Sequence, residues 1–158
     1  MKYRRLTNDE LEELEAEFVR FLASNTITSE EWVQLKVEKP EKVEKLINIF
    51  SDIVFDKILG KVTHMEHREQ QDLRLFHCQE DKMVLLGLRV APNVRIDFTQ
   101  KQTAEEMITN FRKAPQGALK MYRAEKVYKP DRSSELFKML ENGCLISDGA
   151  LYNTLKKL

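Results

Sequence analysis

Apolar residues recur every three or four positions through the first third of the chain, a spacing that predicts amphipathic helices. Thr7 and Glu10 form a capping box ahead of the first stripe, because hydroxyl and carboxylate can each satisfy a free backbone N–H of the first turn. We therefore expect a helix from this cap to about Ala23. Its apolar stripe comprises Leu11, Leu14, Phe18, Phe21 and Leu22.

Two more helices are expected in the same region. Thr28 and Glu31 repeat the capping box and predict a short helix. Pro40 suits the first turn of the next helix, because its missing N–H would have no helical partner there, and Gly60 is typical of a helix end. This helix has the strongest pattern of the chain and is expected to pack centrally. Its stripe comprises Val43, Leu46, Ile47, Phe50, Ile53, Val54 and Leu59.

From Lys61 the apolar residues alternate with polar ones, which is the period of a β-strand. Short polar turns separate the runs "KVTHMEHR", "DLRLFHCQ" and "KMVLLGLRV", which predicts an antiparallel meander. The alternating segment "VRIDF", residues 94–98, is a candidate for a fourth strand.

The two faces of this meander are expected to differ in their surroundings. One face should pack on the helix of residues 41–59 and carries Leu73, Leu75, Val84, Leu86 and Leu88. The opposite face is less polar than a solvated one and carries Phe76, Cys78, Met83 and Leu85. A large exposed apolar area is uncommon in a monomer, so we expect C-terminal helices or a partner to cover this second face.

The last third of the chain is expected to be mainly helical. Thr103 and Glu106 form another capping box, and the helix that they begin should stop before Pro115. Residues 118–129 fit either a strand or a helix, and we favour a helix.

The C-terminal segment "SSELFKMLENGCLISDGALYNTLKKL" is typical of a helix, a turn with glycine and a second helix capped by Ser147, which resembles a helix-turn-helix. A DNA-reading helix presents its N-terminal end to the groove, yet that end carries Asp148, while Lys156 and Lys157 lie at the other. An ordinary helical hairpin over the core is therefore the favoured interpretation.

These elements predict an α+β fold in which an antiparallel meander of three to four strands packs against N-terminal and C-terminal helices. We expect one domain over residues 1–158, helical in 1–60, a β-meander in 61–99 and helical in 103–158. The composition agrees with a globular protein, because 42% of the residues are hydrophobic and 33% are charged. A chain of this length can bury a core without disulfides or metal.

The net formal charge is zero, which gives the molecule no general attraction to nucleic acid or anionic lipid. Binding of either would need a local patch, and the best candidate is the basic, tyrosine-containing segment of residues 112–132. Exposed lysines that keep a helix in solution are the commoner explanation. As possible partner-binding residues we select Lys113, Lys120, Tyr122, Arg123, Lys126, Tyr128, Lys129 and Arg132, with the apolar Phe76, Met83 and Leu85.

All three histidines and one of the two cysteines lie in "THMEHREQQDLRLFHC", residues 63–78. Successive strand residues point to opposite faces, so His64 and His67 should face opposite ways, as should His77 and Cys78. Zinc needs three or four converging ligands, and a thiol is activated only by an imidazole on its own side. We therefore expect no metal site and no catalytic cysteine here.

The register of this hairpin decides which side chains meet. A turn at residues 69–71 would place Glu66 opposite Arg74 and His64 opposite Phe76. A shift by one residue would instead bring His64 beside His77. Even that pair is too few ligands for a metal unless an acid from elsewhere joins it.

Other features argue for a cytoplasmic protein without a membrane segment. Cys78 and Cys144 lack CxxC spacing and are expected to be reduced, and "MKYRRLTNDE" lacks the apolar core of a signal peptide. No apolar stretch approaches the roughly 20 residues that span a bilayer. Nucleotide-binding, protease and hydrolase motifs are absent, which lowers the expectation of an enzyme, and no cofactor is expected.

The pieces "MKYRRLT", "ITSEEW", "EKPE", "FSD" and "DGALY" together resemble a family of small uncharacterised bacterial cytosolic proteins, a domain of unknown function. The resemblance spans nearly the whole chain and implies no activity, cofactor or binding residue. We expect a non-enzymatic protein–protein interaction module or accessory subunit that binds a protein partner or a further copy of itself. The alternatives are a nucleic-acid or ribosome-associated protein that uses residues 112–132 and the C-terminal hairpin, and an enzyme with an unrecognised site.

Overall fold

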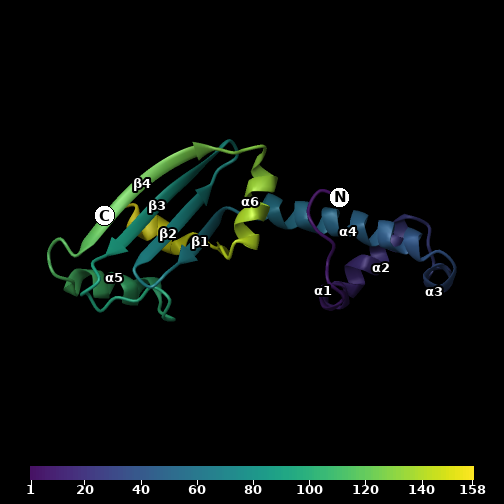
Figure 1. The fold of residues 1–158 in the computed structure, drawn as a ribbon, viewed down its shortest axis with the longest axis horizontal. Helices are drawn as coiled ribbons and strands as arrows, with labels where there is room; N and C mark the ends of the chain where they lie inside the picture. Colours follow the sequence, from purple (N-terminus) through teal and green to yellow (C-terminus); the bar gives the residue numbers. More distant parts are fainter. The chain divides into compact units, whose positions relative to one another are not determined.

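The computed structural model describes residues 1–158 and divides them into two compact units, residues 1–60 and residues 61–158 (Figure 1). The first unit is helical, and the second is a five-stranded antiparallel sheet with helices. The α+β class is therefore confirmed. Each unit is described by itself below, and the expectation that the chain is one domain stays a prediction.

The helical unit contains α1 (Asn8–Glu13), α2 (Glu15–Ser24), α3 (Ser29–Glu38) and α4 (Pro40–Lys61). The capping boxes at Thr7 and Thr28 both form, and α4 begins at Pro40 as predicted. The single helix expected over residues 7–23 is instead two helices. They are separated at Leu14, whose φ of −104° and ψ of 22° leave the helical region, although its N–H still bonds to Glu10.

Aromatic rings fill the interior of the helical unit. Phe18 lies against Trp32 and Phe50, with ring centroids 5.2 and 4.9 Å apart, and Leu22 and Ile47 are buried beside them. Such aromatic pairs stabilise beyond the area that they bury. The predicted stripes of α2 and α4 therefore share this core in part, whereas Ile53 of the α4 stripe is 51% exposed.

The N-terminal segment is fastened to α4 by side chains of the "FSD" piece. The buried Ser51 hydroxyl accepts a bond from the Leu6 N–H and donates to the Ile47 carbonyl. The Asp52 carboxylate accepts from the backbone N–H groups of Lys2 and Tyr3 at 2.7 and 3.0 Å. Two pieces of sequence that are far apart in the chain thus form one hydrogen-bonded contact.

The second unit is built on a sheet in the order β4-β3-β2-β1-β5, in which all neighbours are antiparallel. Its strands are β1 (His64–Arg68), β2 (Asp72–Cys78), β3 (Lys82–Val90), β4 (Leu119–Val127) and β5 (Leu145–Ser147). Its helices are α5 (Ala104–Lys113), α6 (Arg132–Glu141) and α7 (Ala150–Leu155). The expected meander of three to four strands is therefore the centre of a larger sheet that later segments complete.

Two strand assignments from sequence were wrong. Residues 118–129 contain β4 rather than a helix, and β4 forms an edge of the sheet with few buried side chains, so it has no apolar alternation to reveal it. Residues 94–98 are a loop rather than a fourth strand. This loop carries Phe98 into the core, where the ring is fully buried and its N–H donates to Gln70.

The C-terminal segment is also not the helical hairpin that was expected. Between α6 and α7 the chain extends as β5 and pairs with β1, so that His64 lies opposite Ser147. Asp131 caps α6, and α7 begins after Gly149 at a φ of 84°. The resemblance to a helix-turn-helix therefore does not hold.

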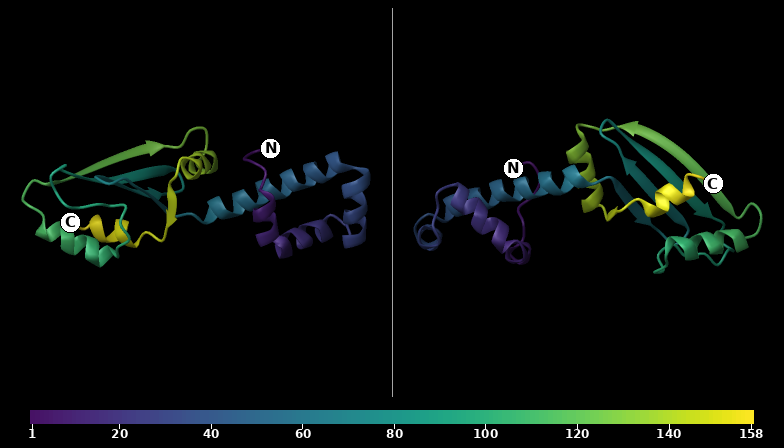
Figure 2. Two further views of the ribbon diagram at one scale, coloured as in Figure 1. Left: turned by 60° about the horizontal axis from the view of Figure 1, so that its bottom comes forward. Right: turned by 180° about the vertical axis from the view of Figure 1, so that it is seen from behind.

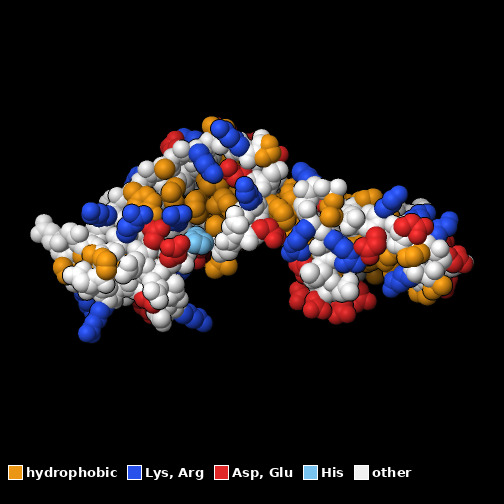
Figure 3. Space-filling view, in the orientation of Figure 1, with side chains coloured by type: hydrophobic (Ala, Val, Ile, Leu, Met, Phe, Trp, Pro, Cys, Tyr) orange, Lys and Arg blue, Asp and Glu red, His pale blue; other side chains and the backbone are white.

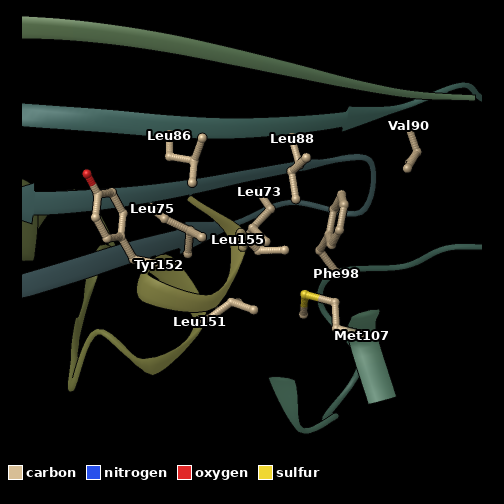
Figure 4. Close-up of a cluster of buried hydrophobic side chains, with 10 residues drawn as sticks. All are labelled: Leu73, Leu75, Leu86, Leu88, Val90, Phe98, Met107, Leu151, Tyr152 and Leu155. Carbon is tan, nitrogen blue, oxygen red and sulfur yellow. The ribbon is translucent and has the colours of Figure 1, made fainter. Parts of the chain in front are cut away.

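One face of the sheet, the covered face, is buried beneath α5 and α7 (Figure 2, right). Figure 4 shows Leu73, Leu75, Leu86 and Leu88 from the strands pointing toward the side chains of these helices and the preceding loop, which are Phe98, Met107, Leu151, Tyr152 and Leu155. The residues of this face were chosen correctly. The prediction that the helix of residues 41–59 covers them was wrong, because the buried cluster contains no residue of that helix.

Candidate partner-binding face

The opposite side of the sheet, the open face, carries one continuous apolar row. The strand register aligns one residue from each strand across the sheet, namely Ile146, Met65, Phe76, Leu85 and Ala124. Met65 is buried, Phe76 and Leu85 are half-buried, and Ala124 and Ile146 are exposed. In Figure 3, apolar side chains accordingly lie over the middle of the sheet. The predicted residues Phe76 and Leu85 are cross-strand neighbours at its centre.

Helix α6 covers only the end of the open face where β1 begins and β2 ends (Figure 1). Cys78 and Met83, which lie opposite each other there, are buried, as is Leu136 of α6. Burial raises the pKa of the Cys78 thiol to about 11, so the thiol stays protonated at neutral pH. Met83, one of the predicted partner-binding residues, is therefore not accessible.

Two of the predicted basic-segment residues hold this end of the fold together. Arg132 donates to the backbone carbonyls of Val62, Cys78 and Gln79. The Tyr128 hydroxyl donates to the Gln79 carbonyl at 2.6 Å, and burial raises the pKa of this phenol to about 12. Both side chains are therefore used in hydrogen bonds within the sheet unit.

The other end of the open face is charged and hydrogen-bonded. The Asp72 carboxylate accepts from Arg74 Nε at 3.0 Å and from the Tyr122 hydroxyl at 2.6 Å. The Tyr122 ring lies directly over Gly87, where no other residue would leave room for it, and the Arg89 guanidinium sits 5.5 Å from the ring centroid. Beside them is a shallow hollow of about 660 Å³ that Asp72, Arg74 and Arg89 help to line.

Positive charge borders the part of the apolar row that lies on β2, β3 and β4. Alternation along the strands places Arg74, Arg89, Lys120 and Lys126 on the open face, and Figure 3 shows blue side chains around the orange ones. Asp72 is the one acidic residue that the five strands direct to this side, and two neighbours already bind it. Lys126 pairs with Glu135 of α6 at 2.9 Å. The open face is therefore apolar in the middle and cationic at its border.

The remaining predicted residues lie elsewhere. Arg123 projects toward the covered face and donates to the Lys156 carbonyl at 3.2 Å. Lys113 ends α5, and Lys129 follows β4. Of the residues that were selected from sequence, the structure thus brings together Phe76, Leu85, Lys120, Tyr122 and Lys126 on the open face.

The histidines occupy both faces of the sheet. His64 and His77 lie opposite each other on the covered face, and His67 lies on the open one. The register that was expected first, with His64 opposite Phe76, is wrong by one residue, and the shifted register holds. The connection is one residue longer than assumed, because the Glu69 N–H bonds to the Asp72 carbonyl and closes a loop over residues 69–72.

The two facing imidazoles form a stacked pair beneath the "DGALY" piece. Their ring centroids are 4.5 Å apart with planes 3° from parallel, and the Tyr152 ring lies 5.3 and 5.4 Å from them. Gly149 approaches so closely that an added Cβ would lie 2.5 Å from His64 Nδ1. The C-terminal piece therefore fits onto the pair at short range.

The stacked pair favours packing over chemistry. The lone pairs of parallel rings lie in separate planes and do not converge on one ion, and no group of three His, Cys, Asp or Glu side chains in the structure could hold a metal. Burial lowers the pKa of both His64 and His77, and the nearby Lys156 ammonium lowers them further. The rings are thus held neutral against α7.

A comparison with known protein families finds a match that covers the whole chain. A model described as a family of unknown function (DUF6495) matches residues 1–158. The chain belongs to this family. DUF6495 membership confirms the resemblance seen in the sequence, while a bacterial and cytosolic origin stays a prediction. No curated protein and no solved structure matches the chain.

The helices were also compared with what a bilayer requires. None of them combines the length and the apolar character that crossing a membrane takes.

Proposed function

We propose that this DUF6495 member is a non-enzymatic interaction module, or accessory subunit, whose open face binds an acidic amphipathic segment of a protein partner. The observation that carries the proposal is the apolar row across all five strands, with Phe76 and Leu85 at its centre. The chain covers the other face of the same strands and leaves every residue of this row except Met65 partly or fully exposed.

The apolar row supports binding because its uncovered part is contiguous. Scattered exposed apolar residues are ordinary, whereas a contiguous patch with a polar rim is typical of an interaction site. Phe76, Leu85 and Ala124 are direct cross-strand neighbours, so a single apolar surface on a partner could cover all three. Aromatic residues at the centre of such a patch commonly contribute most of the binding free energy.

The charge of the border favours an acidic partner. Arg74, Arg89, Lys120 and Lys126 are all exposed around the row, and guanidinium groups bind carboxylates with two parallel hydrogen bonds. An acidic segment would also be attracted over a distance, whereas a basic one would be repelled. The partner segment should therefore combine an apolar stripe with Asp or Glu on the side that meets Arg74, Arg89 and Lys120.

A nucleic-acid partner is the alternative with some support, because four cations and two aromatic residues share this face. Stacking of a base needs a free ring surface. The Tyr122 ring has Gly87 against one side and the Arg89 guanidinium near it, and its hydroxyl is bound by Asp72. These contacts favour protein over RNA or DNA as the ligand of the open face.

An enzyme with an unrecognised site has less support. Catalysis by cysteine requires a lowered thiol pKa, yet burial raises the pKa values of both Cys78 and Cys144. The histidines with shifted pKa values are packed against the Tyr152 ring, and His64 Nδ1 lies 3.0 Å from the hydroxyl of the preceding residue, Thr63, within hydrogen-bond distance. These groups favour structural roles.

A photo-crosslinking experiment tests the proposal. Phe76→p-benzoylphenylalanine keeps an aromatic side chain at the centre of the row, and the same amino acid at the exposed Lys101 provides a matched control. In the cells that naturally express the chain, irradiation should yield a discrete, nuclease-resistant protein adduct from the first variant and none from the second. Charge reversal by Arg74→Glu with Lys120→Glu should abolish that adduct.

Two results would overturn the proposal. A nuclease-sensitive adduct at position 76 would assign the face to nucleic acid. Failure of both sites to form any adduct, in cells that contain the folded full-length chain, would remove the open face as a binding site.

A further inference from the structure

A second surface, within the helical unit, also has the character of an interface. A groove of about 960 Å³ runs between the α1–α2 wall and α3, with α4 as its floor. Leu22, Val43 and Ile47 are buried at its base, and Phe18 and Trp32 line it above. The volume lies at the upper end of what ligand sites enclose, about 300–1,000 Å³. The helical unit thus has a deep, partly apolar groove that is open to solvent.

Apolar side chains also protrude at the rim of the groove. Val19 on α2 and Val33 on α3 line its two walls and are 51% and 62% exposed. Val37 lies one helical turn beyond Val33, outside the groove, and is 81% exposed. The same surface therefore presents both an apolar hollow and an apolar ridge.

Unpaired charges of opposite sign lie on the two walls. Glu12 and Glu15 line the α1–α2 wall, while Lys36 lines the α3 wall. None of the three forms an ion pair within the chain, and Lys36 Nζ is 5.6 Å from the Trp32 ring centroid. Arg5 and Glu44, also in the groove, neutralise each other at 2.8 Å.

We propose that two copies of this chain associate through the groove around a two-fold axis. The Val33–Val37 ridge of each copy occupies the groove of the other, and each Lys36 faces Glu12 and Glu15 of the second copy. A two-fold interface must be self-complementary, with each patch supplying both halves of every contact. A hollow, a ridge, an acidic wall and a basic side chain on one surface meet that requirement.

The position of Val37 distinguishes a second copy from a small molecule. A ligand held in the groove would cover Val33 but leave Val37 in solvent, because Val37 does not line the groove. A helix laid across the groove covers both. The groove residues all belong to the helical unit and those of the open face to the sheet unit. Failure of one proposal therefore leaves the other unaffected.

Sedimentation of the purified full-length chain over a range of concentrations tests the proposal. The unmodified chain should show a monomer–dimer equilibrium that Val37→Lys abolishes. Lys36→Glu alone, and Glu12→Lys with Glu15→Lys alone, should each raise the dissociation constant by about tenfold or more, because each places like charges face to face. Lys57→Glu on α4, outside the groove, is the matched charge control and should leave the dissociation constant unchanged.

Mixing supplies the decisive result. When the Lys36→Glu chain is combined with the Glu12→Lys, Glu15→Lys chain, both reciprocal contacts again join opposite charges, so a mixed dimer should form near the unmodified affinity. Circular dichroism confirms that each variant folds. Three outcomes would overturn the proposal: a monomer at every concentration, a dimer that Val37→Lys does not affect, or folded variants that fail to combine when mixed.

Discussion

The covered and open faces of the sheet are built from the same strands, yet they differ in what surrounds them. Neighbouring residues on β3 show the contrast, because Leu86 is 2% exposed under α7 while Leu85, on the other side, is partly exposed. Strand β2 repeats it with Leu75 and Phe76. The side chains are equally apolar, so the difference lies in the cover and not in the strands.

The extent of the cover also varies within the open face. Cys78 and Met83 share this face with Phe76 and Leu85, but only the first two are buried, at the end where α6 lies. Helix α6 has ten residues and does not reach the middle of the sheet. An interaction surface can thus arise where a covering element is too short for the apolar surface beneath it.

The largest expected effect on stability comes from truncating a side chain on the covered face. Leu86→Ala should lower the free energy of unfolding of the sheet unit by about 2–5 kcal/mol, because a cavity remains where the side chain was packed. Leu85→Ala is the matched control and should cost about 1 kcal/mol or less, since its surroundings include solvent. Urea unfolding followed by circular dichroism measures both. Equal losses would contradict the assignment of the two faces.

The next effect concerns the fit of α7 onto the covered face. Gly149→Ala places a methyl group 2.5 Å from His64 Nδ1 and should destabilise the unit by about 1–3 kcal/mol beyond any backbone strain. Gly117→Ala isolates that strain, because Gly117 has a similar φ of 79° with no atom within 4 Å of an added Cβ. Thermal unfolding of the two variants should therefore differ. Identical midpoints would mean that the ring contact is loose.

A smaller effect should appear on acidification. The pKa values of His64 and His77 are lowered in the folded chain by burial, so the unfolded chain binds protons that the folded one resists. Stability from these groups is present above the ordinary imidazole pKa of 6.5 and is lost as the pH falls below it. Urea unfolding between pH 7.5 and about 5 measures the slope.

Substitution of the stacked pair sharpens that result. His77→Phe keeps a ring against Tyr152 but removes a titrating group, so it should reduce the slope of stability with pH. His67→Phe, on the open face, is the control for loss of an imidazole outside the stack. If His67→Phe changed the slope of stability with pH and His77→Phe did not, the pH dependence would come from the open face, and the prediction would be wrong.

The smallest effect on stability is expected at the centre of the open face. Leu85→Lys should change the free energy of unfolding by no more than about 1 kcal/mol, because the ammonium can reach solvent from a half-buried position. The same change should abolish the protein adduct at position 76. Loss of folding with this substitution would show that the row belongs to the core.

The helices were predictable from sequence because their signals are local, whereas the edge strands were not predictable. The capping boxes at Thr7, Thr28 and Thr103 involve residues three positions apart, so the sequence contains the whole interaction. Strand β4 buries almost nothing on either face, and β5 has only three residues, so neither carries a periodic pattern. Their pairing depends on contacts that are distant in sequence.

The candidate site was predictable in its members but not in its assembly. Phe76 and Leu85 were selected as an apolar surface, and Lys120, Tyr122 and Lys126 as a basic segment. That they share one face follows from the register of β4 on β3, which required β4 to be a strand. Arg74 and Arg89 were missed for the same reason, because alternate charged residues on a strand acquire a role only when the neighbours are known.

The place of β5 and α7 in the sheet unit has a consequence for biosynthesis. Strand β1 emerges from the ribosome well before its outer neighbour β5 and the helix that shields the stacked imidazoles. Until then the nascent polypeptide exposes Leu73 and Leu75 on strands with an unpaired edge. Such a state is prone to bind chaperones or to aggregate. Premature termination before Leu145 would make that vulnerable state permanent.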